Sequence, residues 1–141
     1  MINGINSREM ILEILLEIEE GEHSHVAIRN ALSKYQFLPK QDRAFITRVC
    51  EGTLEYRIQI DYIINSFSKV TVDKMKPAIR EILRSAVYQL KYMDSVPDSA
   101  VCNEAVKLAQ RKGFYNLKPF VNGVLRTIAR EMDQVRFLKR R

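Results

Sequence analysis

The sequence predicts an all-α protein, folded as a compact bundle of about seven helices. Apolar residues recur with a period near 3.6 along almost the whole chain, which is the spacing of one face of a helix. No stretch alternates apolar and polar residues as a half-buried strand would. The breaks between the periodic stretches are short and contain glycine or proline, so we expect short loops between neighbouring helices.

Length and composition fit a single domain. The 141 residues are 46% hydrophobic and 28% charged, which is ordinary for a globular chain that folds without a disulfide or a metal. We expect the domain to cover residues 1–136 and interpret 137–141 as a basic tail or the start of a linker.

The first two helices have clear boundary residues. Asn6 or Ser7 is expected to begin the first helix, with Glu9 three residues after Asn6 as in a capping box. Gly21 tolerates the left-handed conformation and is expected to end that helix. Ser24 is then expected to cap a second, shorter helix.

A long helical region follows, from Pro39 or Lys40 to about Phe67. Gly52 lies inside it and costs about 1 kcal/mol relative to alanine in a helix. A glycine kept at this cost indicates either a kink or a close crossing with another helix. We expect Arg43 to be structural, tying this region to its neighbours, because charges among core residues are usually paired.

Three further helices complete the bundle. Asp73 is expected to cap the fifth helix, with Pro77 in its first turn. Pro97 is expected to start the sixth helix, Gly113 to stop it, and residues 116–119 to restart the chain into the seventh. The expected centre of the core lies on the fifth helix, at Ile79, Leu83, Val87 and Leu90.

Several classes of protein are excluded or disfavoured by the sequence. The longest apolar runs are broken by glutamates, and the first residues lack the pattern of a secretory signal, so we expect neither a membrane span nor export. Cys50 and Cys102 lie within apolar helical stripes, which favours inert thiols in a reduced, cytoplasmic setting. His23 and His25 lack further ligands at a fixed spacing, so we expect no metal site. We also expect no catalytic residue and no cofactor site.

The charge is distributed unevenly along the chain. Residues 1–38 carry a net charge of −3, residues 39–106 carry +1, and residues 107–141 carry +8. A strongly basic final quarter suits a polyanionic partner such as RNA, although a solvated basic surface has the same composition.

The candidate RNA-binding residues are concentrated near the carboxyl-terminal helix. Residues 118, 122, 126 and 130 are spaced four apart, so they form a row about 18 Å long on one helix face. The full predicted RNA-binding set is Arg8, Lys40, Arg111, Lys112, Lys118, Asn122, Arg126 and Arg130. Phe114, Tyr115 and Phe120 are predicted to face a partner, and Phe114 or Tyr115 could instead stack an unpaired base. Burial of Phe114 in the core is the competing interpretation.

Several stretches of the sequence resemble one known family. They are residues 42–45 (DRAF), 82–90 (ILRSAVYQL), 103–109 (NEAVKLA) and 120–126 (FVNGVLR). Together they resemble NusB-like domains, in the same order and over residues 7–131. The resemblance implies an all-α bundle of two subdomains that binds RNA.

The family has two branches, and the resemblance favours one of them. Free-standing NusB antitermination factors bind a transcript element with ribosomal protein S10 and usually begin with an arginine-rich helix, whereas this chain has only Arg8 there. The Val-Leu-Arg at 124–126, and the stretches 38–45, 52–54 and 92–97, are similar to the N-terminal domain of Sun-type small-subunit rRNA cytosine-C5 methyltransferases. Those enzymes bind S-adenosylmethionine in a separate C-terminal domain.

We therefore interpret the chain as the rRNA-positioning domain of such a methyltransferase, without the catalytic domain and without enzymatic activity of its own. S-adenosylmethionine is expected only in the missing domain, which could be a partner in cis. The alternatives are a free-standing antitermination factor acting with S10, and a protein–protein docking module. Whether the chain is a fragment or a complete protein stays open.

Overall fold

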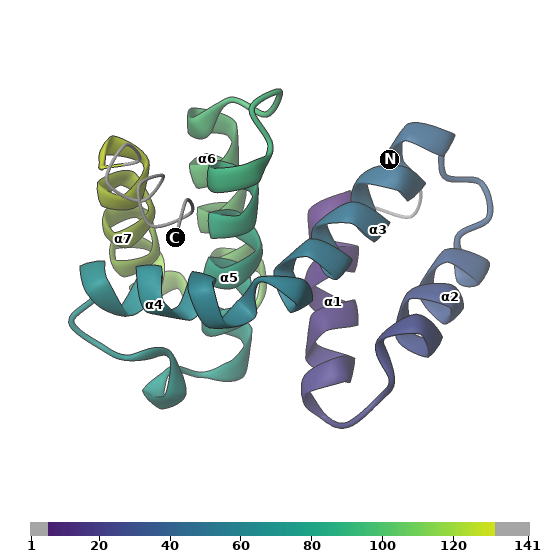
Figure 1. Cartoon of the computed structure of the whole chain (residues 1–141), viewed down its shortest axis with the longest axis horizontal. Helices are drawn as coiled ribbons and strands as arrows, with labels where there is room; N and C mark the ends of the chain where they lie inside the picture. The colour runs from purple at the N-terminus through teal and green to yellow at the C-terminus, as the bar shows by residue number, and fades with distance from the viewer. Residues whose placement is uncertain (1–5, 132–141) are drawn as a thin grey trace.

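The computed structural model describes residues 6–131, and over this range the chain forms seven α-helices and two 3-10 helices without a strand. The all-α prediction is therefore confirmed (Figure 1). The elements are α1 (Ser7–Glu19), α2 (Ser24–Lys34), α3 (Lys40–Glu55), α4 (Arg57–Phe67), η2 (Val72–Lys74), α5 (Pro77–Tyr92), α6 (Asp98–Arg111), η3 (Tyr115–Leu117) and α7 (Lys118–Arg130).

The helices form two groups. Helices α1–α3 lie on one side of Figure 1 and α4–α7 on the other, and α3 runs from the first group toward the second. Helix α5 lies where the groups meet and contacts α1, α3, α4, α6 and α7. From Glu81 to Lys91 every residue of α5 is buried, and the expected core centre at 79, 83, 87 and 90 is confirmed.

Some helix boundaries follow the expected signals and others do not. The Asn6 side chain accepts a hydrogen bond from the Glu9 backbone N–H at 2.8 Å, as a capping residue does. Gly21 has a φ of 118° just after α1, a conformation that favours glycine. The expected cap at Ser24 is wrong: Ser24 is already helical, His23 precedes the helix, and no side-chain bond caps it.

The region expected to be helical from about 40 to 67 consists of two helices. The break falls at Tyr56, between Glu55 and Arg57, rather than at Gly52. Gly52 instead lies at a close crossing, because a Cβ there would overlap the ring of Tyr88 on α5. Close helix packing is thus the reason for this glycine.

The predicted cap of α5 is also wrong. Asp73 lies in the 3-10 helix η2, and Lys76 occupies the cap position before Pro77. Proline at the first helical position needs no backbone N–H and has a suitable φ, so α5 can begin there without a side-chain cap.

Arg43 is structural, as expected. Its Nη1 donates to the carbonyl oxygens of Leu32 at 3.0 Å and Tyr35 at 3.3 Å. These carbonyls belong to the end of α2, where backbone oxygens lack intrahelical donors. Arg43 therefore ties α3 to α2.

Helix α5 carries buried charges that are neutralised by side chains from α1 and α4. Arg84 donates to both carboxylate oxygens of Asp61, at 2.7 and 2.9 Å, and to Glu81 at 2.7 Å. Arg80 pairs with Glu19 of α1. Burial, together with a hydrogen bond to Glu19, raises the pKa of Glu81 to about 8 despite the nearby Arg84. The network joins α1, α4 and α5 through charge as well as apolar packing.

The close crossing of α3 and α5 can be tested with two glycine substitutions. We expect Gly52→Ala to lower the free energy of unfolding by about 1–3 kcal/mol, because the new Cβ meets the Tyr88 ring. Gly123→Ala, on α7, is the matched control, since a Cβ at this position meets nothing within 4 Å. This substitution should stabilise the protein by about 1 kcal/mol. Denaturant unfolding measures both. Equal effects would show that the Gly52–Tyr88 contact does not constrain the packing.

Candidate nucleic-acid interface

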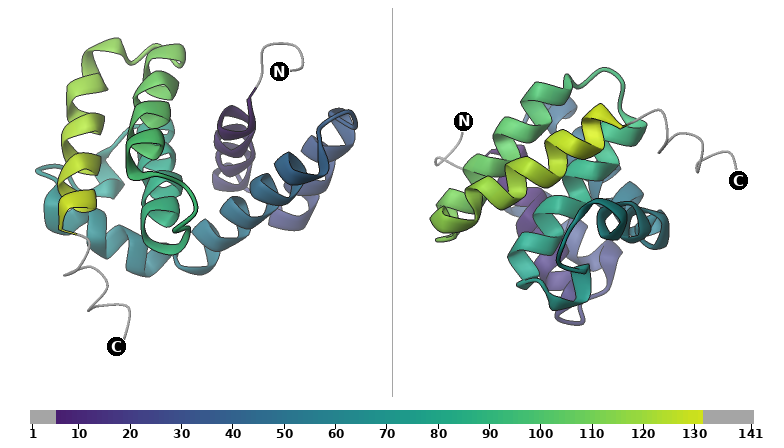
Figure 2. Two further views of the ribbon diagram at one scale, coloured as in Figure 1. Left: turned by 90° about the horizontal axis from the view of Figure 1, so that it is seen from above. Right: turned by 90° about the vertical axis from the view of Figure 1, so that its left-hand side faces the viewer.

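Helix α7 has an apolar face and a basic face. Val121, Val124, Leu125 and Ile128 are buried against the other helices. The remaining positions include Lys118, Asn122, Arg126 and Arg130, the predicted row, which we name the α7 row. Their spacing of four places them along one side of the helix. Figure 2 shows α7 lying along the outside of its helix group.

The cations of the α7 row have polar partners but no acidic ones in the described chain. Lys118 donates to Gln110 Oε1 at 2.8 Å and lies 4.4 Å from the centre of the Tyr115 ring. Arg130 is exposed, and its contact with another described side chain is one of 3.5 Å to the Thr127 hydroxyl. Within residues 6–131, no carboxylate lies within ion-pair distance of these side chains or of Arg126. Their positive charge is therefore uncompensated by direct pairing.

Arg126 is held by two asparagines. Its Nε donates to Asn122 Oδ1 at 3.1 Å, one turn earlier on α7. One Nη donates to Asn103 Oδ1 of α6 at 2.9 Å. Asn103 was not among the predicted site residues, because its only signal was its place in the NEAVKLA stretch.

Arg111 and Lys112 differ from the α7 row because they face carboxylates. Arg111 Nη1 lies 3.5 Å from Glu9 Oε1, and Lys112 Nζ lies 3.8 Å from Glu9 and 3.3 Å from Glu13. Both acids belong to α1. The acidic first helix thus partly neutralises the bases at the end of α6, and their predicted contact with RNA stays a prediction.

The two remaining predicted bases lie on other helices, Arg8 on α1 and Lys40 on α3. Arg8 donates to Gln89 at 3.3 Å and lies 5.2 Å from the centre of the Phe45 ring. Burial lowers the pKa of Arg8, and the negative charge of Glu104 partly offsets this by raising it. Lys40 begins α3 at the end of the molecule far from α7 (Figures 1 and 2). The structure therefore does not gather the predicted residues into one site.

The aromatic residues predicted to face a partner have different environments. Tyr115 is 67% exposed, with Lys118 over its ring. Phe114 and Phe120 are half-buried and pack against the core. Of the three, Tyr115 offers the most surface to a base or a partner protein.

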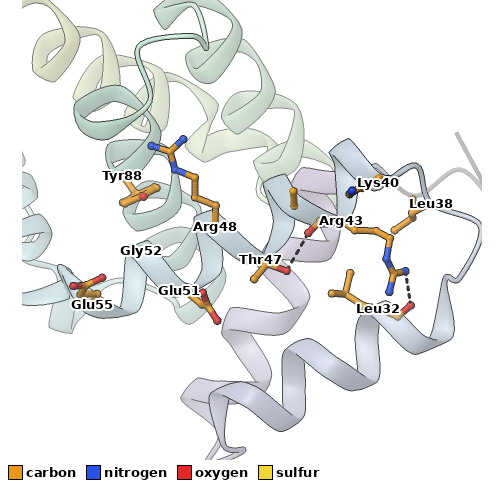
Figure 3. A pocket seen from close by; sticks show the side chains of 11 residues that line it. Leu32, Leu38, Lys40, Arg43, Thr47, Arg48, Glu51, Gly52, Glu55 and Tyr88 are labelled. Atoms are coloured by element: carbon orange, nitrogen blue, oxygen red, sulfur yellow. Dashed lines mark hydrogen bonds between the residues drawn. The ribbon is translucent and has the colours of Figure 1, made fainter.

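An open groove of about 870 Å³ runs along one face of α3 (Figure 3). Lys40 and Arg43 lie toward its α2 end, and Glu55 and Tyr88 toward its α5 end. Arg48, also in its lining, donates to the Tyr92 carbonyl at 3.0 Å. The mixture of bases and acids gives this groove no charge preference comparable to that of the α7 row.

Two cysteines and a pair of histidines are the remaining groups capable of reactive or ligand chemistry. Cys50 and Cys102 are buried, and burial raises the pKa of both thiols, which disfavours the reactive thiolate. The His23 and His25 rings stack with centroids 6.0 Å apart. Across residues 6–131, no three histidine, cysteine or acidic side chains gather as metal ligands, and no helix is long and apolar enough to span a membrane.

Comparison with known proteins gives two kinds of relative. The chain is 35% identical over 124 residues to "Probable ribosomal RNA small subunit methyltransferase B" of Bacillus subtilis, covering 88% of this chain but 28% of that protein. It is 34% identical over 133 residues to transcription antitermination protein NusB of Dictyoglomus thermophilum, covering 94% of this chain and 88% of that protein. The chain thus spans under a third of the methyltransferase and most of the antitermination protein.

Solved structures share the fold. T. maritima NusB superposes with a TM-score of 0.80 at 26% identity, covering 89% of each chain. A chain from the crystal structure of antitermination factors NusB and NusE in complex with dsRNA superposes with a TM-score of 0.81 at 21% identity, covering 89% of this chain and 94% of that one. A model of the NusB family matches residues 5–130. This chain belongs to the NusB family.

Proposed function

We propose that the chain binds RNA through the α7 row. The observation that carries this proposal is the set of cations on α7 that are partly or fully solvent-accessible and have no carboxylate partner in the described structure. Such cations attract phosphates without first breaking an ion pair, and they release counterions from the RNA on binding. A helix face about 18 Å long can neutralise two or three phosphates along a strand.

Tyr115 adds an aromatic ring to the charged surface of the α7 row. Its ring is exposed beside Lys118 and can stack an unpaired base, which is how single-stranded RNA is often held. The net charge of +6 favours approach to RNA in the same way. A NusB-family structure bound to dsRNA supports the proposal, since it shows that the fold is compatible with RNA.

For the biological role, we propose positioning of small-subunit rRNA for a methyltransferase domain in cis. The similarity to a methyltransferase supports this assignment. The exposed face of α1 also supports it, because it carries Glu13 and Glu17 where an antitermination factor would be expected to carry arginines. S-adenosylmethionine would belong to the catalytic domain, and the site of action would be the cytoplasm.

The second candidate is a transcription antitermination factor. The specific observation in its favour is that the chain covers 88% of the Dictyoglomus NusB protein but only 28% of the methyltransferase. A pull-down separates the two roles. Retention of ribosomal protein S10 together with a transcript element would favour antitermination, whereas selective retention of small-subunit rRNA would favour the methyltransferase role.

Charge reversal on α7 tests RNA binding directly. We expect Arg126→Glu with Arg130→Glu to weaken binding to single-stranded RNA by about tenfold or more and to reduce the salt dependence of the affinity. Arg57→Glu with Lys69→Glu is the matched control, because both bases are exposed outside α7, Arg57 on α4 and Lys69 in the connection after α4. Fluorescence anisotropy across a salt series measures the affinities. An equal loss in the two variants, or none in the first, would reject the α7 row as the binding surface.

The ion pairs between α1 and α6 lead to a second expectation. Glu9→Gln with Glu13→Gln should release Arg111 and Lys112 and raise the RNA affinity by about two- to fivefold at low salt. Glu17→Gln with Glu20→Gln changes the net charge equally and removes no ion pair seen in the described residues. The same RNA titration compares them. If both double variants raise the RNA affinity equally, the effect reflects net charge. The ion pairs with Glu9 and Glu13 then do not keep Arg111 and Lys112 from binding RNA.

A further inference from the structure

The contact of α6 with α7 includes a guanidinium whose orientation is fixed from two helices. Arg126 donates from Nε to Asn122 and from one Nη to Asn103. Arg126 and Asn122 are half-buried, whereas Asn103 is exposed. The two asparagines lie on different helices, so together they limit rotation of the arginine side chain.

The bonds used to hold Arg126 leave many of its donors available. A guanidinium has five N–H donors and no acceptor, and two of these donors are used by the asparagine oxygens. Each asparagine also keeps its own NH₂ group, because its Oδ1 is the atom that binds Arg126. The three side chains therefore present a cluster of N–H donors with a single positive charge.

From this geometry we infer that Asn103, Asn122 and Arg126 form a preorganised site for one phosphate of the RNA strand, which we name the α6–α7 clamp. The inference rests on the proposed RNA binding and adds a specific ligand group and a positioning residue, Asn103. A fixed, planar guanidinium binds a phosphate through two parallel hydrogen bonds, and less conformational entropy is lost because the side chain is already ordered. The donor set, rich in N–H groups and free of carboxylates, matches the oxygens of a phosphodiester.

The rest of the α7 row is built differently. Arg130 is exposed, and within residues 6–131 its side chain has only a 3.5 Å contact, with Thr127 on its own helix. Lys118 carries a compact ammonium that cannot bind a phosphate in the forked, bidentate manner. These two cations contribute charge, whereas Arg126 contributes charge together with a fixed direction.

A purely structural role for the three residues makes a different prediction. If Arg126 only tied α6 to α7, removing Asn103 would lower stability and leave the RNA affinity of the folded protein unchanged. In the α6–α7 clamp, the loss of Asn103 loosens the guanidinium and lowers the affinity. The two roles can therefore be separated by measuring folding and binding on the same variants.

The test uses substitutions that preserve charge. Arg126→Lys keeps the charge but removes the fork, and we expect it to lower the affinity for single-stranded RNA about tenfold, with an unchanged salt dependence. Arg57→Lys is the matched control, an exposed arginine on α4 outside the α7 row, and it should change the affinity less than about twofold. Asn103→Ala should lower the affinity about threefold to tenfold. Alanine is a good helix former at an exposed position, so this variant should remain folded.

Thermal unfolding and anisotropy titrations against several RNA sequences complete the experiment. The α6–α7 clamp requires that Arg126→Lys and Asn103→Ala lower the affinity for every RNA sequence alike, since a phosphate contact carries no base preference. A loss confined to guanine-containing RNAs would overturn the phosphate assignment in favour of base recognition. Equal affinities for Arg126→Lys, Arg57→Lys and the parent protein would overturn the α6–α7 clamp alone. The proposed RNA binding would fail separately, if the double charge reversal on α7 had no effect.

Discussion

The fold depends on the enclosure of helix α5, which is buried from Glu81 to Lys91. A helix surrounded by other helices can retain charged residues only if they are paired, because an unpaired buried charge is very costly. Arg84 meets this requirement through the carboxylate of Asp61 on α4 and also donates to Glu81 of its own helix. The half-buried Arg80 is paired with Glu19 of α1. The enclosed helix therefore determines which elements must lie next to it, and the two helix groups are joined at this point.

The proposed RNA surface follows from that arrangement. Helices α6 and α7 pack against α5, so the apolar side of α7 is used for the core and its row of cations is left on the outside. Helix α1 packs against another side of α5 and also approaches α6. The acidic beginning and the basic end of the sequence thus come close enough for Glu9 and Glu13 to pair with Arg111 and Lys112.

Much of the fold could be predicted from the sequence, because helical periodicity is a local property. The family resemblance proposed from motifs is confirmed by the match over residues 5–130. The errors at Ser24 and Asp73 arose where several polar residues or a proline compete to define a helix start. The cap position is the residue before Ser24 in α2, and in α5 it is Lys76, three residues after Asp73. The division at Tyr56 left no glycine or proline signal, since the chain continues as a helix on both sides.

The site was less predictable because it depends on contacts between distant segments. The α7 row follows from spacing alone and lies on one helix, as expected. The pairing of Lys112 with Glu13 joins residues 99 positions apart, and no local pattern indicates it. Asn103 could not be identified as a partner of Arg126 until the packing of α6 on α7 was known. The pairing of Arg84 with Asp61 could not be predicted either, because it depends on the packing of α4 against α5.

The most direct test of the central claim is an NMR titration of the intact chain with a short single-stranded RNA. The account predicts that the largest amide shifts fall on α7 from Lys118 to Arg130, at Tyr115, and at Asn103 on α6. At a fixed RNA concentration, these shift changes should become smaller together as the salt concentration rises. Shifts centred on the α3 groove, or no shifts at RNA concentrations well above those of the protein, would contradict the assignment of the α7 row as an RNA-binding surface.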